Sequence, residues 1–508
     1  SATGWPAPDC SRATPWAGPM PEPLLVGREL TFRYGKQSAP IFSNLSLTVE
    51  EGETVLLMGP SGCGKSTLAY CLAGLYPEYA GELAGTVRLA GRPLESYGPA
   101  ARARTVSILF QNPDNQFCMD RVDHEVLFAL ENINYPGDLR ARMDELLELA
   151  GLRELAQTPI RTLSGGTKQK LALCTALATG ARLLILDEPF ANLDPASCAQ
   201  LSTQLQALNR RGLTLLVVDH RPDWWRSFLT RVVLMEDKGN LDAGAFPPSE
   251  LEARREALTR RGLFLDDGWL NGRRPPAVPR PPETAAEAED LALFHAREKK
   301  PCLEHLSFRL EKGSVTALIG RNGAGKTTLL TALAGVGRHR GRLRVAGRVG
   351  LVFQNPRFQF LTLTVEEEVL TTLRAARPQA AEEARAAEAE ALLGEFGLLL
   401  WRKHSPYELS QGQQRRLALL SMLAGEQSLL LLDEPTYAQD ERSTRFILDL
   451  LERRVAEGLT AVLATHDLAL ARACANQILL LEDGRLTTLA PAELDAYAAE
   501  RRMPSCEA

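Results

Sequence analysis

Continuous apolar runs of strand length recur along the chain, at residues 54–58, 183–186 and 213–218. Strands of a parallel sheet are buried on both faces, so they are apolar throughout instead of alternating. The first run leads into a glycine-rich turn and then into residues 65–75, which have helix-forming composition. Segments 139–156 and 380–396 are rich in Ala, Leu, Glu and Arg, which indicates further helices. The pattern predicts α/β architecture with a helical insertion.

The same succession of motifs occurs twice. GPSGCGKST recurs as GRNGAGKTT, and its lysines, Lys65 and Lys326, lie 261 positions apart. FQNPDNQF recurs as FQNPRFQF, LSGGTKQK as LSQGQQRR, and LLILDEP as LLLLDEP, the last two pairs being 246 positions apart. His220 and His466 close the series, again 246 apart. One order at nearly constant spacing predicts two copies of one domain.

The Pro-rich stretch RRPPAVPRPP, followed by the acidic ETAAEAED, has the composition of a linker. We therefore predict one domain at residues 24–245, a linker at 246–288 and a second domain at 289–508. Residues 1–23 are also Pro-rich and have no periodicity, so we expect a disordered tail, in which Met20 is a candidate first residue of the native protein.

The two GxxxxGK[ST] segments predict phosphate-binding loops. Glycines let backbone N–H groups approach phosphates, and the helix that follows adds partial positive charge. The lysines would bridge the β- and γ-phosphates, and the Ser66 and Thr327 hydroxyls would bind Mg²⁺. The predicted nucleotide-binding residues are Gly59, Gly62, Gly64, Lys65, Ser66 and Thr67 in the first loop and Gly320, Gly323, Gly325, Lys326, Thr327 and Thr328 in the second.

Two acid pairs end the apolar runs LLIL and LLLL. The first carboxylate of each pair, Asp187 or Asp433, is predicted to hold Mg²⁺. The second, Glu188 or Glu434, is predicted to polarise the attacking water.

Composition restricts the class of protein. Charged residues at 24% and hydrophobic residues at 45% are ordinary for a soluble globular protein, and a net charge of −5 argues against a nucleic-acid-binding surface. The nine cysteines are scattered without a CxxC pair, which favours reduced thiols in the cytoplasm. No apolar run approaches the roughly 18–20 residues of a membrane-spanning helix, so any membrane work would need another subunit.

With LSGGT at residues 163–167, the chain resembles a tandem ATP-binding-cassette (ABC) protein. The resemblance implies two P-loop ATPase domains, each with a RecA-like α/β core, an antiparallel β subdomain and a helical subdomain. It also implies that LSGG-type residues of one domain reach the γ-phosphate bound by the other. ATP and Mg²⁺ are the implied cofactors, and both sites are expected to hydrolyse ATP.

Two composite sites follow from the resemblance. One combines the first P-loop with Gln111, Asp187, Glu188, His220, Ser410 and Gly412. The other combines the second P-loop with Gln354, Asp433, Glu434, His466, Ser164, Gly165 and Gly166. The catalytic residues so assigned are Glu188, Glu434, His220, His466, Gln111 and Gln354. The metal ligands are Ser66, Gln111, Asp187, Thr327, Gln354 and Asp433.

The second copy departs from the family pattern in three places. Its signature has Gln411 before Gly412, and the loop after its acid pair reads YAQD where the first copy has ANLD. Tyr34 is the expected adenine-stacking residue of the first copy, whereas His295 takes that position in the second. Cys63, inside the first P-loop, is either a small filler or an alkylation-sensitive thiol.

QNPxxQF in both copies resembles the energy-coupling factor (ECF) ATPases of prokaryotic vitamin and metal-ion importers. The implied partners are a transmembrane T-component and a substrate-binding S-component, which would hold the chain at the cytoplasmic face of the membrane. The expected cargo is a vitamin, a vitamin precursor or a metal ion. No homodimer and no nucleic acid are required.

Acids that follow each QNPxxQF are candidates for binding arginines of the T-component, with helix capping as the alternative role. They are Asp120, Asp123, Glu125, Glu366, Glu367 and Glu368. Two alternative functions remain open. The first is the fused ATPase of a sugar-type importer, and the second is a soluble tandem cassette acting on ribosomes or DNA.

Overall fold

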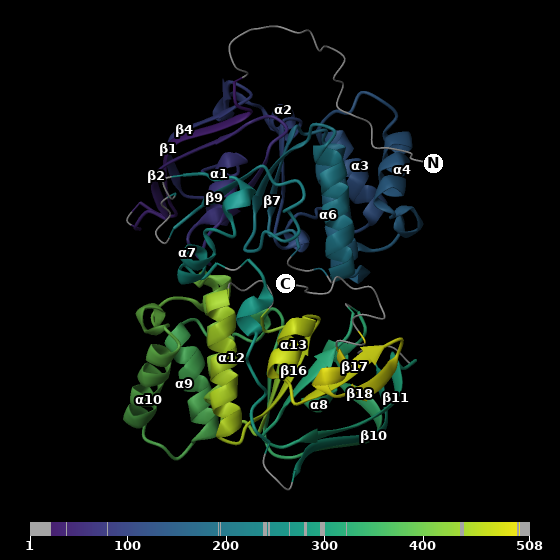
Figure 1. The fold of residues 1–508 in the computed structure, drawn as a ribbon, viewed down its shortest axis with the longest axis vertical. Helices are drawn as coiled ribbons and strands as arrows, with labels where there is room; N and C mark the ends of the chain where they lie inside the picture. Colours follow the sequence, from purple (N-terminus) through teal and green to yellow (C-terminus); the bar gives the residue numbers. More distant parts are fainter. Residues whose placement is uncertain are drawn as a thin grey trace. The chain divides into compact units, whose positions relative to one another are not determined.

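A computed structural model describes residues 22–36, 38–78, 80–190, 193, 195–236, 241, 244–263, 265–278, 282–294, 300–321, 323–436, 441–494 and 497. The chain divides into two compact units between Asp266 and Asp267. Both units contain a mainly parallel sheet, a separate antiparallel sheet and helices, so the predicted α/β fold with two P-loop domains is confirmed (Figure 1).

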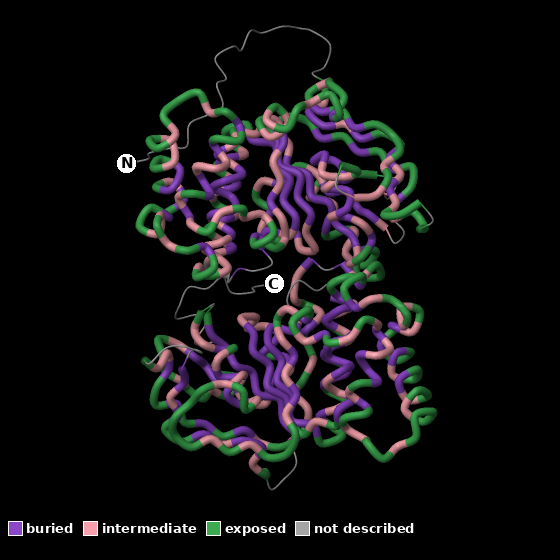
Figure 2. Tube along the Cα trace, turned by 180° about the vertical axis from the view of Figure 1, so that it is seen from behind, coloured by how far each residue is buried: buried purple, intermediate pink, exposed green. Residues whose placement is uncertain are grey.

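The parallel sheet of the first unit has the order β6-β7-β8-β3-β9. Its strands are β6 (Val106–Leu109), β7 (Leu183–Asp187), β8 (Thr214–Val218), β3 (Thr54–Met58) and β9 (Arg231–Leu234). Every residue of β3, β7 and β8 is buried, as expected for parallel strands covered on both faces (Figure 2). The three strands predicted from continuous apolar runs are therefore confirmed.

The antiparallel sheet of the first unit has the order β2-β1-β4-β5. Its strands are β1 (Leu25–Arg33), β2 (Phe42–Val49), β4 (Glu82–Leu89) and β5 (Arg92–Pro93). The helices are α1 (Lys65–Leu72), α2 (Pro99–Ala103), α3 (Val122–Asn132), α4 (Leu139–Ala150), α5 (Gly165–Ala178), α6 (Pro195–Asn209) and α7 (Arg255–Arg260). Helices α3, α4 and α5 share a separate hydrophobic core, and together they form the predicted helical insertion.

The second unit repeats this plan with a smaller antiparallel sheet and a larger main sheet. Its antiparallel sheet, in the order β11-β10-β13, contains β10 (Thr284–Phe294), β11 (Leu303–Glu311) and β13 (Arg338–Val345). Its larger sheet, in the order β14-β15-β16-β12-β17-β18, contains β12 (Val315–Ile319), β14 (Val349–Val352), β15 (Leu429–Asp433), β16 (Thr460–Thr465), β17 (Gln477–Glu482) and β18 (Arg485–Leu489). Only β18 runs antiparallel to its neighbour.

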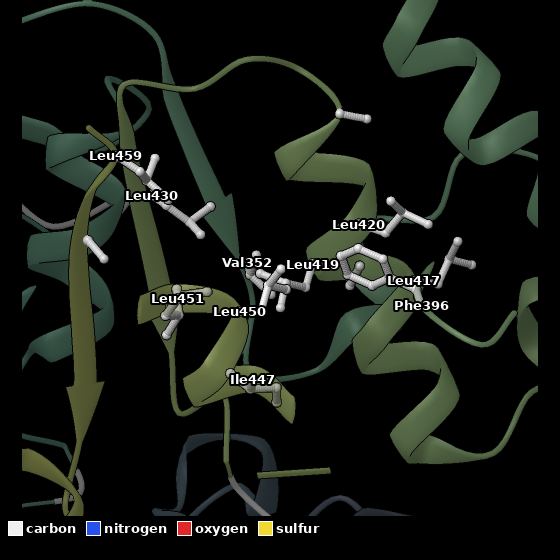
Figure 3. Close-up of a cluster of buried hydrophobic side chains, with 14 of the residues drawn as sticks. Val352, Phe396, Leu417, Leu419, Leu420, Leu430, Ile447, Leu450, Leu451 and Leu459 are labelled. Atoms are coloured by element: carbon white, nitrogen blue, oxygen red, sulfur yellow. The ribbon is translucent and has the colours of Figure 1, made fainter. Parts of the chain in front are cut away.

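The helices of the second unit are α8 (Lys326–Leu333), α9 (Val365–Ala376), α10 (Glu382–Glu395), α11 (Gln411–Leu423), α12 (Glu441–Ala456) and α13 (Leu468–Cys474). Phe396 lies fully buried among Leu417, Leu419 and Leu420 of α11 (Figure 3). Its ring meets Phe446 of α12 edge-on at 5.3 Å between centroids, which joins the helical insertion to the core.

The predicted linker at 246–288 is wrong at both ends. Phe246, Leu251, Leu258 and Leu263 are buried in a core cluster of the first unit, because apolar residues spaced along α7 and its flanks pack against that unit. At the other end, residues 284–290 of the acidic segment lie in β10, where Ala285, Ala286 and Ala288 are buried. Of the predicted tail at 1–23, all but residues 22 and 23 lie outside the described residues.

Candidate nucleotide and magnesium sites

Each glycine-rich loop runs from a buried strand into a helix, β3 into α1 and β12 into α8. Gly64 and Gly325 precede these helices with φ of 105° and 103°, a conformation that L side chains rarely adopt. A Cβ at Gly59 would lie 2.5 Å from the Met235 carbonyl oxygen, and one at Gly320 would lie 2.6 Å from the Leu481 carbonyl oxygen. The loops therefore need glycine for close backbone approach, as a phosphate cradle does.

The loop lysines fold back over their own loops. Lys65 Nζ donates to the carbonyl oxygens of Gly59 at 2.7 Å and Pro60 at 3.0 Å. Lys326 Nζ donates to the Gly320 carbonyl oxygen at 2.7 Å. Both ammonium groups are buried beside helix N-termini, so the cradles combine positive charge with backbone N–H groups suited to phosphate.

At each site a hydroxyl at the start of a helix meets a carboxylate at the end of a strand. Ser66 Oγ donates to Asp187 Oδ1 at 2.8 Å, and Thr327 Oγ1 donates to Asp433 Oδ2 at 2.6 Å. These paired oxygens are the hard ligands that Mg²⁺ prefers, so the donor set fits the ion. Burial raises the pKa of Asp187 to about 7 and also raises the pKa of Asp433. A divalent cation would favour both ionised forms.

The second acid of each pair has an unusual backbone. Glu188 and Glu434 have φ of 46° and 47°, a left-handed conformation that is strained for a residue other than glycine. The N–H of Glu188 donates to the Val218 carbonyl oxygen at 2.8 Å, and that of Glu434 to the Ala464 carbonyl oxygen at 2.9 Å. Such strain is typical of functional positions held in place by their surroundings.

The carboxylate of Glu188 is held by two side chains. His220 Nε2 lies 2.9 Å from Oε1, and Gln111 Nε2 donates to Oε2 at 2.5 Å. Burial alone would raise the pKa of Glu188, but His220 and Lys65 outweigh it, so the pKa is lowered. Glu188 is therefore an ionised acceptor, as the predicted role of general base requires.

The carboxylate of Glu434 keeps the corresponding histidine but has a different second partner. His466 Nδ1 lies 3.1 Å away and Lys326 Nζ 3.3 Å away. Burial raises the pKa of Glu434, but His466 and Lys326 outweigh it and lower the pKa. The Gln354 side chain is exposed, whereas Gln111 in the first unit is bound to the glutamate. The two sites hold the same acid by different contacts.

Tyr34 and the two signature serines lie close to the N-terminal turns of helices. The half-exposed Tyr34 lies beside α1, where its hydroxyl and Thr67 Oγ1 are 2.9 Å apart. Ser164 caps α5 by accepting from the Thr167 N–H at 3.2 Å, and Ser410 caps α11 by accepting from the Gln413 N–H at 3.4 Å. Both signature segments thus open a helix, where N–H groups can face an anion. Their pairing with the other unit's P-loop remains a prediction.

Several predicted features lie outside the described residues. They are His295, the YAQD loop at 437–440, and residues 191, 192 and 194 of ANLD. Cys63 is buried, with its Sγ 2.8 Å from the Cβ position of Gly59. That placement is compatible with the small-filler interpretation.

Sequence reasoning missed three contacts of the first site. Tyr70 donates its hydroxyl to Asp187 Oδ2 at 3.0 Å, and Trp225 Nε1 donates to Asp219 Oδ2 at 2.9 Å. Asp219 Oδ1 accepts from the His220 N–H at 2.7 Å. Tyr70 could have been found, because it lies four residues after Ser66 on one helix face. The Trp225 contact gives no such local signal.

These loops, strand-end acids and serine-capped helices define two ATP-binding P-loop domains of the ABC type. The ABC transporter family matches residues 42–191 and 303–437, and the chain belongs to it. It is a tandem ABC ATP-binding protein, an ATPase that uses ATP and Mg²⁺.

Relatives that match about nine-tenths of the chain include other ATP-binding proteins. YkoD of Bacillus subtilis, named for HMP/thiamine import, is 35% identical over 501 residues, covering 91% of this chain and 90% of that protein. An ABC transporter ATP-binding protein of Methanosarcina acetivorans is 32% identical over 521 residues, covering 90% of this chain and 84% of its own length.

Solved structures of similar fold include an archaeal ABCE1 bound to a ribosome with Pelota, at TM-score 0.67, 20% identity and coverage of 93% of this chain and 80% of that one. RNase-L Inhibitor matches at TM-score 0.61, 21% identity and 93% coverage of both chains. At such identities the likeness shows the fold alone.

Proposed function

We propose that this chain is the ATPase subunit of an ECF-type importer and drives a membrane T-component and S-component from the cytoplasmic face. The observation that carries the proposal is QNPxxQF in both units, with Gln111 in hydrogen-bond contact with Glu188. A glutamine that touches the catalytic acid can transmit the state of the site to the adjoining loop. The relative named for HMP/thiamine import favours a cargo of that kind over a metal ion.

Exposed apolar side chains follow the second QNP segment. Phe358, Leu361 and Leu363 are 78%, 82% and 89% exposed. A cluster of large exposed apolar residues in one short loop is a mark of an interaction site. We assign this loop, residues 358–363, to contact with the T-component. A coupling segment that binds there would need apolar residues.

The corresponding segment of the first unit, residues 115–120, has Asn115 and Asp120 where the second has Phe358 and Leu363. The Asp120 side chain is 85% exposed and lies 3.5 Å from His124. Asp120 thus retains the proposed role of binding a cationic side chain of the partner. The two units would then present different surfaces, one apolar and one acidic. That difference would determine the orientation in which an asymmetric T-component docks on the chain.

The proposed arginine-binding role is wrong for Glu125 and Glu368. Both are buried, and their carboxylates accept backbone N–H groups, from Cys118 and Met119 in one case and from Leu361 and Thr362 in the other. Three further acids pair within the chain. Asp123 binds Arg121, Glu366 binds Lys403, and Glu367 binds Arg374.

In the proposed mechanism, each P-loop binds one ATP and the signature serine of the other unit completes the site. Lys65 and Lys326 would neutralise phosphate charge, and Ser66 with Asp187 and Thr327 with Asp433 would hold the metal ion. Bound Mg²⁺ would supply charge neutralisation at the phosphates. Glu188 and Glu434 orient water and accept its proton, and His220 and His466 fix those carboxylates. Closure is favoured because only the closed state completes both sites.

The test is purification of the full chain from its native membrane. The proposal expects an integral T-component and S-component in stoichiometric amounts. Changing Leu361 and Leu363 to Asp should abolish that association and leave ATP hydrolysis within about twofold. Val336→Asp, at an exposed apolar residue outside the loop, is the matched control and should retain the partners. Association with ribosomes or DNA, or with sugar-importer membrane subunits, would refute the assignment.

A further inference from the structure

Arg415 on α11 differs in kind from its counterpart in the first unit. The counterpart, 246 positions earlier, is Gln169 on α5. Both side chains are almost fully buried, at 4% and 1% exposure. A cation is costly to bury unless it is hydrogen-bonded, so its contacts indicate what it does.

The Arg415 guanidinium joins two segments that matter for ATP hydrolysis. Its Nη1 donates to the carbonyl oxygen of Glu434 at 2.5 Å, and its Nη2 donates to the carbonyl oxygen of Gln354 at 2.7 Å. The planar guanidinium holds these two donors in a fixed relation, which a flexible ammonium or an amide cannot reproduce. One buried side chain therefore fixes the end of β15 to the QNP loop.

Glu434 needs such support because its backbone is strained, with φ of 47°. Its N–H is held by the Ala464 carbonyl oxygen, and Arg415 holds its carbonyl group from the other side. The carboxylate is then free to bind Lys326 and His466. Gln354, held by its backbone, keeps its side chain exposed.

The first unit achieves the same link differently. Within the described part of the chain, neither amide atom of Gln169 has a hydrogen-bond partner. The Gln111 side chain instead donates directly to the Glu188 carboxylate. The glutamate and the QNP loop are thus joined by side chains in one unit and through Arg415 in the other.

We propose that Arg415 is a positioning residue for ATP hydrolysis at Glu434, absent from the other site. Arg415 holds the backbone carbonyl groups of Glu434 and Gln354 in a fixed relation. The Glu434 carboxylate then stays directed at the attacking water, and the Gln354 side chain stays available to the metal ion. The inference rests on the proposed role of Glu434 as general base.

The experiment uses the full chain with one site silenced. Arg415→Gln, which installs the first unit's residue, is made in a Glu188→Gln background and in a Glu434→Gln background. Arg415→Lys tests the guanidinium geometry. Arg416→Gln is the matched control, because it removes an arginine from the next position, which donates to the Phe396 carbonyl oxygen instead. The readouts are kcat and KM for ATP, and hydrogen exchange of the amides of residues 354–360.

In the Glu188→Gln background, Arg415→Gln is expected to lower kcat about tenfold with KM within about twofold, since two charge-assisted hydrogen bonds to the catalytic segments are lost. Arg415→Lys should give an intermediate loss. In the Glu434→Gln background kcat should not change. Exchange at residues 354–360 should rise for Arg415→Gln and not for Arg416→Gln. If Glu188→Gln alone abolishes turnover, the two sites hydrolyse ATP only together. The tenfold loss in kcat is then expected when Arg415→Gln is the single change in the chain.

An unchanged kcat, an equal loss with Arg416→Gln, or a rise in KM alone would overturn the inference. Failure of the base assignment is separate from these results. It would appear as turnover that survives the double change Glu188→Gln and Glu434→Gln, whatever Arg415 does.

Discussion

The two units contain the same glutamate in the same strained conformation and hold it with the corresponding histidine, yet the other side chains that support it differ. In the first unit His220 and Gln111 bind the Glu188 carboxylate. In the second, His466 and Lys326 bind the Glu434 carboxylate, and Arg415 fixes its backbone. The repeated domain has kept the backbone geometry at φ of 46° and 47° while the supporting contacts differ. Equal motifs therefore do not imply equal sites.

The largest expected effect comes from removing both glutamates. The double variant with Glu188→Gln and Glu434→Gln should lose about a thousandfold in kcat, or about 4 kcal/mol, because the amide cannot accept the proton of the attacking water. Phosphate release at saturating MgATP measures it. Each single variant should keep the turnover of the other site. A single variant as inactive as the double would show that the two sites cannot act separately.

A second comparison concerns packing. Phe396 in the second unit corresponds to Ala150 in the first, 246 positions earlier. Phe396→Ala should lower the free energy of unfolding by about 3 kcal/mol, because the removed ring fills a fully buried site against Phe446. Denaturant unfolding measures the change. Leu400→Ala, at an exposed residue in the same region, is the control, and an equal loss there would contradict the packing argument.

The histidines sharpen the catalytic comparison. With the other site silenced, His220→Ala should lower kcat about thirtyfold and His466→Ala about tenfold. The second loss is smaller because the charged Lys326 still holds the Glu434 carboxylate at 3.3 Å, whereas only the neutral Gln111 amide remains on Glu188. Single-site kcat values measure both. A larger loss for His466→Ala would mean that the Lys326 contact does not orient the base.

The smallest effect expected is on the pH dependence of stability. Asp187 has a raised pKa of about 7 in the folded chain, so between its unfolded pKa near 3.8 and that value the folded state retains a proton that the unfolded state has lost. The free energy of unfolding should therefore fall as pH rises through this window.

Without Mg²⁺ and nucleotide, the Tm of the unchanged chain should fall by an amount on the order of a few degrees between pH 5.5 and 7.5 because of Asp187. In Asp187→Asn this contribution to the fall should be absent. Asp433→Asn should remove less of the fall, because burial raises the pKa of Asp433 but Thr327, Lys326 and Arg415 offset part of that rise. Thermal unfolding in chelator-treated buffer measures both. A steeper pH dependence in Asp187→Asn than in the unchanged chain would contradict the assignment.

Much of the fold followed from local patterns. The runs that became β3, β7 and β8 were visible because both faces of those strands are apolar. The linker prediction was wrong because it relied on proline content and gave no weight to the apolar spacing of Leu251 and Leu258. These leucines are buried because α7 and its flanks pack against the first unit.

The sequence by itself determined the chemistry of the two sites: the glycine loops with Lys65 and Lys326, and the acids that end β7 and β15. Those residues are close along the chain or end a strand, so local spacing places them. Only the tertiary structure decided what supports each glutamate. Arg415 lies 61 positions from Gln354 and 19 from Glu434, and His220 lies 32 from Glu188. Such contacts depend on how helices pack against the sheet, which sequence spacing does not encode.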